Sequence, residues 1–410
     1  MNGILGIVSE YNPFHNGHLY HLNYSKKVTK SDFTIAVMSG NFTQRGDSAL
    51  VDKWTRAEMA LKAGVDLVIE LPTLYATSSA ENFADGAIKI LNSLGIVDYI
   101  SFGSETGDIS ALNDVASVLY SEPKEFSNLI TRQLKSGLSY PKARELAISM
   151  YFGSSKKYKE ILESPNNILG IEYLKALKKR KSSIQPIVIK RDYNNYNSKT
   201  VKNGIASATA IRAMIEQNKN IHYVVPFETY ELMEQKKENK ELVKNLSVFE
   251  KQIIYTLRKM TVQEIAALPD VSEGLEYRIK EAANISNNLD SLLKNIRTKR
   301  YVDTRIRRIL LYSLLGIKQK DINMSKRVTP YIRVLGFNKL GKRIISAIAT
   351  NNPRLKIIIS VKKFMESNLD PHLKNMISKD IMATNIYTLG YENNEGFANM
   401  DYTHKVIELK

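Results

Sequence analysis

The sequence has no cysteine and very little tryptophan or histidine. Its 410 residues include no Cys, one Trp and six His. The absence of cysteine excludes disulfides, thiolate zinc sites and cysteine nucleophiles, and it is typical of a cytoplasmic protein. Long hydrophobic runs are also absent: none reaches the roughly 18 residues of a membrane-spanning helix, and no signal peptide opens the chain. We therefore expect a cytoplasmic protein that has no membrane partner.

Charge is distributed unevenly along the chain. The formal net charge is +17, yet residues 1–150 carry 13 Lys and Arg against 16 Asp and Glu. Residues 251–350 carry 20 Lys and Arg against 8 Asp and Glu. Such segregation favours a near-neutral catalytic domain joined to a domain that binds a polyanion. The alternative is a lysine-rich surface that contacts only water.

The remaining composition is that of a globular protein with more than one domain. Hydrophobic residues make up 43% of the chain and charged residues 25%, which are ordinary proportions for soluble proteins. A chain of 410 residues exceeds the size of one ordinary core. Two or three domains are therefore expected.

Strand-like and helix-like segments alternate over the first 220 residues. The strand-like segments are apolar runs typical of buried parallel strands, at Ile4–Val8, Phe33–Met38, Leu67–Leu71, Tyr99–Phe102 and Ile184–Ile189. Helical patterns cover Leu19–Lys27, Lys53–Ala63, Asn82–Leu94, Ile109–Leu119 and Asn167–Lys179. This alternation predicts an α/β fold with a Rossmann-like, doubly wound parallel sheet, which binds ligand at the carboxyl ends of its strands.

The chain changes character near residue 220. Residues 1–220 are predicted to form the α/β domain, with a helical insertion at about 121–160, and residues 221–410 to form a mainly helical, basic region. Helical periodicity dominates from Phe227 to about Ala349. Short apolar runs at Ile357–Val361 and Val406–Leu409 are expected to pack on another domain. There is no internal repeat or low-complexity linker, so closely packed domains are expected.

The most informative motif is His15-Asn16-Gly17-His18, which joins the first predicted strand to the first predicted helix. A helix N-terminus offers N–H groups and a positive dipole end to a phosphate. Two histidines three positions apart can donate to phosphate oxygens, and Gly17 leaves room for a nucleotide at the backbone. The alternative is a surface or capping role. The tetrad resembles the HxGH signature of HIGH-superfamily nucleotidyltransferases, which attack the α-phosphate of ATP and release pyrophosphate. His15 and His18 are therefore the catalytic candidates.

A second phosphate-binding candidate is Ser207-Ala208-Thr209-Ala210-Ile211-Arg212, at the start of an amphipathic helix. It resembles the ISSTxxR motif of nucleotidyltransferases, in which a hydroxyl and helix N-terminal amides hold the β- and γ-phosphates. Ser207 and Thr209 are therefore ATP-binding candidates, whereas Ala208 departs from the motif. The alternative is that Ser207 acts only as an N-cap. No covalent nucleophile is required, because adenylyl transfer depends mainly on positioning and charge stabilisation.

Polar residues and glycine at other predicted strand ends add to this site. Gly103 ends a predicted strand, where the backbone can pack against an adenosine. Asn167, or its neighbour Asn166, begins a predicted helix and can bind adenine or ribose. Arg191 follows a strand and can reach phosphate. The alternative is a helix cap and a surface arginine.

A polar loop at residues 39–47 follows the second predicted strand. Because this loop lacks the pattern of a large apolar pocket, we expect it to bind a small polar second substrate. The candidate residues are Ser39, Gly40, Asn41 and Gln44. No metal-ligating cluster is predicted.

The basic region has a dense group of cations near residue 300. The group comprises Lys299, Arg300, Tyr301, Arg305, Arg307 and Arg308. The spacing of positions 300, 301, 305 and 308 predicts one shared helical face. Arginine and tyrosine together suit phosphate contact and base stacking, so all six residues are candidates for RNA binding. The alternative is a solvated helix face.

Together these segments resemble the bacterial tRNA(Met) cytidine acetate ligase family. The likeness lies in GIVSEYNPFHNGH, SGNFTQRGD, DKWTRAEMALKAGVDLVIELP, FGSE, SPNNILGIEYLKAL and SATAIR, and it continues through the basic half. The resemblance implies ATP-dependent activation of acetate to acetyl-adenylate. It further implies transfer of the acetyl group to N4 of the wobble cytidine in elongator tRNA(Met).

The resemblance also implies the partners and the nucleotide-binding residues. The partners would be ATP, acetate and elongator tRNA(Met); Mg²⁺ is expected to accompany ATP, and no tightly bound cofactor is expected. The loop at residues 39–47 becomes the candidate acetate site. ATP binding carries over to Ile7, Val8, Ser9, Glu10, Tyr11, Asn12, Pro13, Phe14, His15, Asn16, Gly17, His18, Leu19 and Tyr20, with Gly103, Asn167 and Arg191.

Two other functions stay open at this point. A nucleotidyltransferase that adenylylates a small phosphate-containing coenzyme precursor would share the ATP site, but it would not need the basic half. An RNA-binding protein with a relict nucleotide fold would not need two intact phosphate-binding motifs.

Overall fold

A single mixed sheet forms the centre of the molecule. The computed structural model describes residues 3–191, 204–298, 301–367, 370–393 and 398–410. The strand order is β5-β4-β1-β2-β3-β6-β7, and β8 pairs with β6. Five strands run parallel: β1 (Ile4–Ser9), β2 (Phe33–Ser39), β3 (Leu67–Leu71), β4 (Tyr99–Ser104) and β5 (Gln185–Lys190). The predicted α/β fold class is confirmed, and each of the five predicted strands is present.

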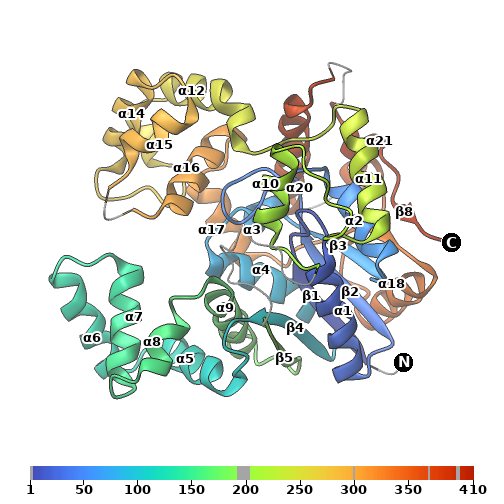
Figure 1. Cartoon of the computed structure of the whole chain (residues 1–410), viewed down its shortest axis with the longest axis horizontal. Helices are drawn as coiled ribbons and strands as arrows, with labels where there is room; N and C mark the ends of the chain where they lie inside the picture. The colour runs from blue at the N-terminus through green and yellow to red at the C-terminus, as the bar shows by residue number, and fades with distance from the viewer. Residues whose placement is uncertain (1–2, 192–203, 299–300, 368–369, 394–397) are drawn as a thin grey trace.

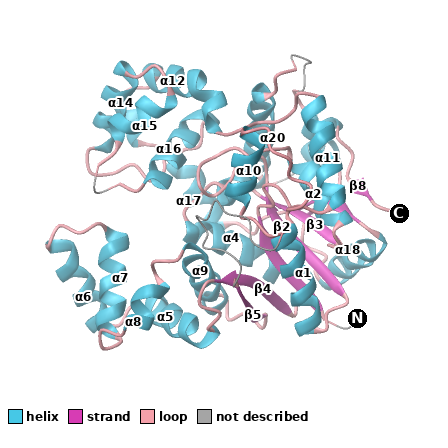
Figure 2. Ribbon diagram, viewed as in Figure 1, coloured by secondary structure: helices cyan, strands magenta, loops and turns pink. Residues whose placement is uncertain are grey.

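Helices cover both faces of this sheet (Figure 2). Along β1, Leu5 and Ile7 belong to the core that also contains buried residues of α1 (Asn16–Thr29) and α2 (Lys53–Lys62). Ile4 belongs to the opposite core, which is built with α4 (Ala80–Ser93), α5 (Ile109–Ser121) and α9 (Pro165–Lys179). The alternation follows from the two-residue repeat of a strand, which sends successive side chains to opposite faces.

The second half of the chain adds three strands to the same sheet. They are β6 (Ile332–Phe337), which runs antiparallel to β3, and the short β7 (Ile357–Ile358) and β8 (Ile407–Glu408). Helical periodicity is expected to dominate up to about residue 349, and β6 is a strand within that range. The charged Arg333 interrupts its apolar pattern, and this side chain is buried against Glu70 and Asp401. The division into residues 1–220 and 221–410 stays a prediction. Strand pairing extends across this boundary, because β3 pairs with β6.

Two groups of helices extend from the sheet core on the same side of the molecule (Figure 1). One group is the predicted insertion, formed by α6 (Lys124–Lys135), α7 (Tyr140–Tyr151) and α8 (Lys156–Ile161). The other group belongs to the basic half and contains α12 (Glu250–Lys259), α13 (Val262–Ala266), α14 (Leu275–Ile285), α15 (Leu289–Ile296) and α16 (Asp303–Leu315).

The remaining helices pack around the sheet. They are α3 (Thr73–Ala76), α10 (Ala208–Glu216), α11 (Phe227–Glu238), α17 (Gln319–Arg327), α18 (Lys339–Asn351), α19 (Val361–Glu366), α20 (Pro371–Tyr387) and α21 (Met400–Thr403). Within the described part of the chain, none of the helices has both the length and the apolar character needed to cross a bilayer.

Candidate nucleotide site

The two motif histidines form the first turn of α1, directly after β1 and its loop. His15 is the N-cap, and its Nδ1 accepts hydrogen bonds from the N–H groups of Gly17 at 3.1 Å and His18 at 3.3 Å. In return, His18 Nδ1 accepts from the N–H of His15 at 3.3 Å. The two rings stack with centroids 3.6 Å apart. The pair is therefore a reciprocal capping box built from imidazoles.

This capping determines where each imidazole carries its proton. Because each Nδ1 accepts from a backbone N–H, the neutral ring must carry its hydrogen on Nε2. Burial, helped by the charges of Arg191 and Arg212, lowers the pKa of His15 to about 3. Burial, followed by His15 and Arg191, holds the pKa of His18 well below its usual range. Both rings are neutral at pH 7, and each has an Nε2–H to donate to an anion.

The second predicted phosphate motif lies beside the first. Asn16 Nδ2 donates to the carbonyl of Gly204 at 2.9 Å, which joins the start of α1 to the segment before α10. Ser207 is the N-cap of α10, and its Oγ accepts from the Ala210 N–H at 3.1 Å. Arg212 donates to the carbonyl of Asn12 at 2.9 Å. The structure thus brings the two motifs together and gives Ser207 a capping role there.

Two neighbouring asparagines lie in the first turn of α9, at the carboxyl end of β4. They differ in which side-chain amide atoms lack a hydrogen-bond partner. Asn167 Oδ1 accepts from Ser104 Oγ at 2.6 Å and from the Glu105 N–H at 3.0 Å. Its Nδ2 is buried and has no hydrogen-bond partner among the described residues. In Asn166, Nδ2 donates to Glu105 at 2.7 Å and Oδ1 accepts from Arg191 at 3.2 Å. Asn167 Nδ2 is thus the one of these two amide groups that has no protein partner among the described residues.

Gly103 and Arg191 meet at the same edge of the sheet. A Cβ at Gly103 would lie 3.0 Å from Cδ of Arg191, so the glycine lets this arginine cross β4 closely. The guanidinium charge of Arg191 contributes to the low pKa values of both motif histidines. The positive charge of Arg191 therefore acts at the capping turn.

The loop at residues 39–47 is largely buried, and several of its polar side chains form hydrogen bonds within the protein. Asn41 Oδ1 accepts from the Lys53 N–H at 2.8 Å, and Asn41 Nδ2 donates to Thr384 at 3.2 Å. Gln44 donates through its side chain to the Ser78 carbonyl at 3.2 Å. Ser39 differs, because its buried Oγ has no hydrogen-bond partner among the described residues. Gly40 is required at its position, since a Cβ there would lie 2.6 Å from Glu70 Oε1.

Arg56 connects the nucleotide loop to this second loop, and sequence reasoning missed it. Its fully buried guanidinium donates to the carbonyls of Glu10 at 2.7 Å and Ser39 at 3.1 Å, and also to that of Gly40. Glu10 makes a further connection by accepting from the Gln44 N–H at 2.8 Å. The sequence carried no signal for this role, because an arginine on a helix is ordinarily exposed.

The cation group near residue 300 is arranged differently from the prediction. The expected shared helical face is wrong, because α16 begins at Asp303 and the buried Tyr301 precedes it. Arg305 donates to the Asp270 carbonyl at 2.7 Å, and Arg308 is 8% exposed and paired with the Asp270 carboxylate at 3.1 Å. These two guanidiniums therefore hold the chain around residue 270. Lys299 and Arg300 lie outside the described residues.

Arg307, on the same helix, lies against the loop at residues 39–47. A Cβ at Gly46 would lie 2.9 Å from Cβ of Arg307, and the charge of Arg307 acts on Asp47. The helical group thus packs directly on the loop that follows β2. The exposed cations of the basic half include four on and beside α17, namely Lys318, Lys320, Lys326 and Arg327.

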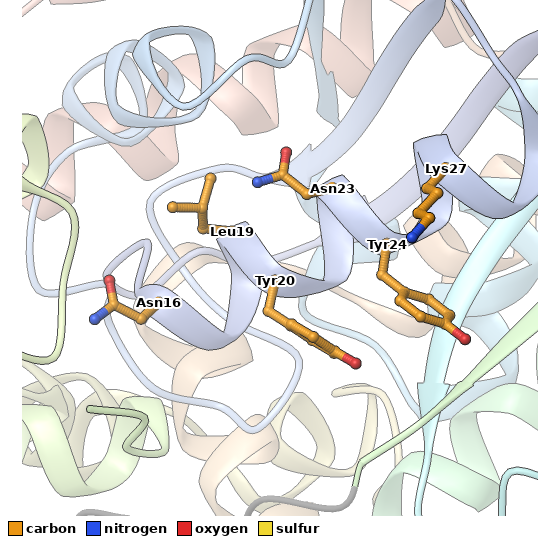
Figure 3. A pocket seen from close by; sticks show the side chains of 6 residues that line it. All are labelled: Asn16, Leu19, Tyr20, Asn23, Tyr24 and Lys27. Atoms are coloured by element: carbon orange, nitrogen blue, oxygen red, sulfur yellow. The ribbon is translucent and has the colours of Figure 1, made fainter. Parts of the chain in front are cut away.

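A groove of about 410 Å³ follows the outer side of α1 (Figure 3). It is lined by Asn16, Leu19, Tyr20, Asn23, Tyr24 and Lys27. Tyr20 and Tyr24 stack with ring centroids 5.7 Å apart. Neither motif histidine lines this groove. Leu19 and Tyr20, which the resemblance placed in the ATP-binding range, line it together with Asn16, and their contact with ATP stays a prediction.

Comparisons with known proteins match the chain over nearly its whole length. Residues 1–401 match the family model described as HIGH Nucleotidyl Transferase. The tRNA(Met) cytidine acetate ligase of Thermoanaerobacter sp. (strain X514) is 48% identical over 411 residues, which cover 99% of this chain and 100% of that protein. The chain belongs to this family of HIGH nucleotidyl transferases.

Solved structures of family members share the fold. The apo form of Thermotoga maritima TmcAL has a TM-score of 0.95 at 34% identity, with 99% of each chain covered. The same protein bound with alpha-thio ATP has a TM-score of 0.92, also at 34% identity and 99% coverage of both chains. A member of the family with this fold thus binds an ATP analogue.

Proposed function

We propose that this chain is an ATP-dependent tRNA(Met) cytidine acetate ligase. It activates acetate as acetyl-adenylate and then transfers the acetyl group to N4 of the wobble cytidine in elongator tRNA(Met). The observation that carries the proposal is the meeting of two phosphate-binding motifs at one edge of the sheet. This meeting occurs in a chain 48% identical over its length to a tRNA(Met) cytidine acetate ligase.

In the first step, an acetate oxygen attacks the α-phosphorus of ATP and pyrophosphate leaves with the electron pair of the broken P–O bond. The Nε2–H groups of His15 and His18 donate to phosphate oxygens, whose charge grows in the transition state. Arg191 and Arg212 supply a positive field at the same place, as their effect on the pKa of His15 indicates. No group on the protein has to accept a proton in this step, because acetate is already ionised.

Residues around the histidines hold the rest of the nucleotide. The unpaired Nδ2 of Asn167 donates to the adenine or ribose. Gly103 leaves room for Arg191 beside this site, and a contact of Gly103 with the adenosine stays a prediction. The N-terminus of α10, with Ser207 and Thr209, receives the β- and γ-phosphates. The further contacts assigned to Ile7 through Tyr20 stay predictions.

Acetate is proposed to bind against the loop that follows β2. The unpaired Oγ of Ser39 is its best-supported partner, since the Asn41 side chain is engaged at both ends. Arg56 fixes this loop relative to the β1 loop, so that acetate meets ATP at a defined distance.

Mg²⁺ is proposed to accompany ATP and not to occupy a site of its own. Among the described residues, no three His, Cys, Asp or Glu side chains are grouped so as to hold a metal ion. Mg²⁺ commonly keeps several waters and binds through substrate phosphates. ATP itself would therefore supply most of the ligands.

In the second step, the cytidine N4 lone pair attacks the acetyl carbonyl carbon and AMP leaves with the electron pair of the C–O bond. One N4 proton is released, and N4-acetylcytidine remains. The exposed cations around α17 would hold the tRNA phosphates while this occurs. A small coenzyme precursor would have no use for such a surface.

The direct test incubates the purified protein with radiolabelled acetate, ATP and total tRNA. We expect label in acid-precipitable material that ribonuclease releases, together with AMP and pyrophosphate. Acetate-dependent ATP cleavage without label in RNA would contradict the tRNA assignment. ATP cleavage that requires a phosphate ester in place of acetate would favour the small-molecule alternative.

A further inference from the structure

Among the described residues, none of those assigned to the nucleotide site lies in the helical insertion between α5 and α9. Its helices α6 and α7 pack on each other and extend from the body of the molecule (Figure 1). Phe126 of α6 is fully buried in this pairing, and Arg144 of α7 pairs with Glu172 of α9 at 3.2 Å, which attaches the insertion to the core. The insertion is thus a packed element whose other surfaces are open.

The outward side of α6 is a continuous basic and polar face. At 100° per residue, five side chains fall within an arc of about 100° on the side away from Phe126. All five are exposed, and they are Lys124, Asn128, Thr131, Arg132 and Lys135. Each can donate a hydrogen bond, and none is aromatic or aliphatic. We call this set the α6 face.

The cations of the α6 face are not neutralised within the protein. No described carboxylate lies within ion-pair distance of Lys124, Arg132 or Lys135, whereas Lys142 on α7 pairs with Glu145 at 2.5 Å. Residues 124–161 carry 8 Lys and Arg against 3 Asp and Glu. The excess positive charge is therefore presented to solvent.

We propose that the α6 face is a second contact surface for the phosphodiester backbone of the tRNA substrate. The proposal rests on the proposed function. Lys, Arg, Asn and Thr side chains are typical phosphate contacts, whereas protein interfaces are enriched in aromatic residues that this face lacks. The insertion extends on the same side of the molecule as α12 to α16 (Figure 1). Figure 1 draws α17 between these two groups, so one RNA can meet both the α17 cations and the α6 face.

The test removes the three cations together, as Lys124→Ala, Arg132→Ala and Lys135→Ala. Alanine favours helix, so circular dichroism and the thermal midpoint should match the unaltered protein. Binding of elongator tRNA(Met) is measured across a range of salt concentrations. We expect several-fold weaker binding at 0.15 M salt, and a plot of log affinity against log salt that is flatter by about 2 units, from roughly 0.7–0.9 per contact.

A matched control removes three cations from α18, on the other side of the molecule, as Lys339→Ala, Lys342→Ala and Arg343→Ala. This control should keep the affinity and slope of the unaltered protein. Equal weakening by both sets would show an effect of net charge alone and would overturn the proposal. An unchanged slope of log tRNA affinity against log salt in the α6 variant would also overturn the proposal. That result is expected if the α6 face binds an acidic protein partner. Failure of the proposed function would appear differently, as no tRNA acetylation by the unaltered protein.

Discussion

The histidines of the α1 turn serve two purposes at the scale of single residues. Each Nδ1 caps backbone N–H groups, and each Nε2–H is left for a ligand. Replacement by alanine would remove both contributions together and would confuse a folding defect with a catalytic one. Asparagine accepts hydrogen bonds well at helix N-termini, so it can retain the cap and remove only the ring.

His18→Asn should slow acetyl-adenylate formation by about 10²–10³-fold, because it removes one donor to the charged transition state. The measurement is acetate-dependent exchange of labelled pyrophosphate into ATP, without tRNA. The far-ultraviolet circular dichroism should not change. Near-normal exchange in the folded variant would show that His18 does not act on the α-phosphate.

His15→Asn should make stability less sensitive to acid. His15 is 2% exposed, and burial lowers its pKa to about 3, far below the unfolded value of 6.5. Below about pH 6.5 the unfolded chain therefore binds a proton that the folded chain does not, so the free energy of unfolding falls as pH falls. One such group contributes about 1.4 kcal/mol per pH unit until the folded pKa is reached.

Urea unfolding at pH 7, 6 and 5 checks this expectation. The free energy of unfolding of the variant should fall less steeply between pH 6 and 5 than that of the unaltered protein. Parallel falls in the two proteins would mean that His15 is not held neutral by burial.

At the scale of secondary-structure elements, a buried network of charges joins β3, α2, β6 and α21. Lys53 Nζ lies 2.9 Å from Glu70 and 2.7 Å from Asp401. Arg333 contacts the same two carboxylates. Arg333 and Asp401 come from the second half of the chain, so the network ties that half to the sheet beneath the second-substrate loop.

Lys53→Met should destabilise the protein by about 3–5 kcal/mol, because it leaves buried carboxylates without one of their cations. The matched change Lys62→Met removes a lysine from the same helix, where it pairs with Glu58 at 3.0 Å near the surface. This control should cost no more than about 1 kcal/mol. Chemical denaturation measures both changes, and equal losses would contradict a structural role for the network.

The sequence predicted those elements in which the local hydrophobic pattern matches the burial of the residues. β1, β2, β3 and β4 were predictable because most of their residues are apolar and buried. β5 lies at the edge of the sheet with only Ile189 buried, and it was predictable from its apolar run alone. β6 was missed because Arg333 is its second residue, and the partners that neutralise this charge come from distant segments. The histidine turn was predictable from local spacing. Arg56 was not, because its role depends on carbonyl groups of two loops that only the fold brings together.

At the scale of the whole molecule, positive charge lies in separate places and not on one helix face. The expected platform around residue 300 is partly used for internal pairing with Asp270. Exposed cations remain around α17 and on the α6 face. A long polyanion is therefore the partner that this distribution suits best.

Replacing Lys318, Lys320 and Lys326 with alanine should weaken tRNA binding and flatten its dependence on log salt by about 2 units. ATP affinity should not change, because these side chains lie outside the histidine turn. Binding is measured by filter retention between 50 and 200 mM salt. An unchanged slope would remove α17 from the tRNA surface.

The proposed activity is the ATP-dependent transfer of one acetyl group to a single cytidine. It is tested most directly by following labelled acetate into elongator tRNA(Met) transcripts with cytidine or uridine at the wobble position, followed by digestion to nucleosides. We predict close to one acetyl group per cytidine transcript, recovered as N4-acetylcytidine with one AMP formed, and no label in the uridine transcript. Equal labelling of both transcripts, or ATP cleavage with no labelled nucleoside, would contradict the account.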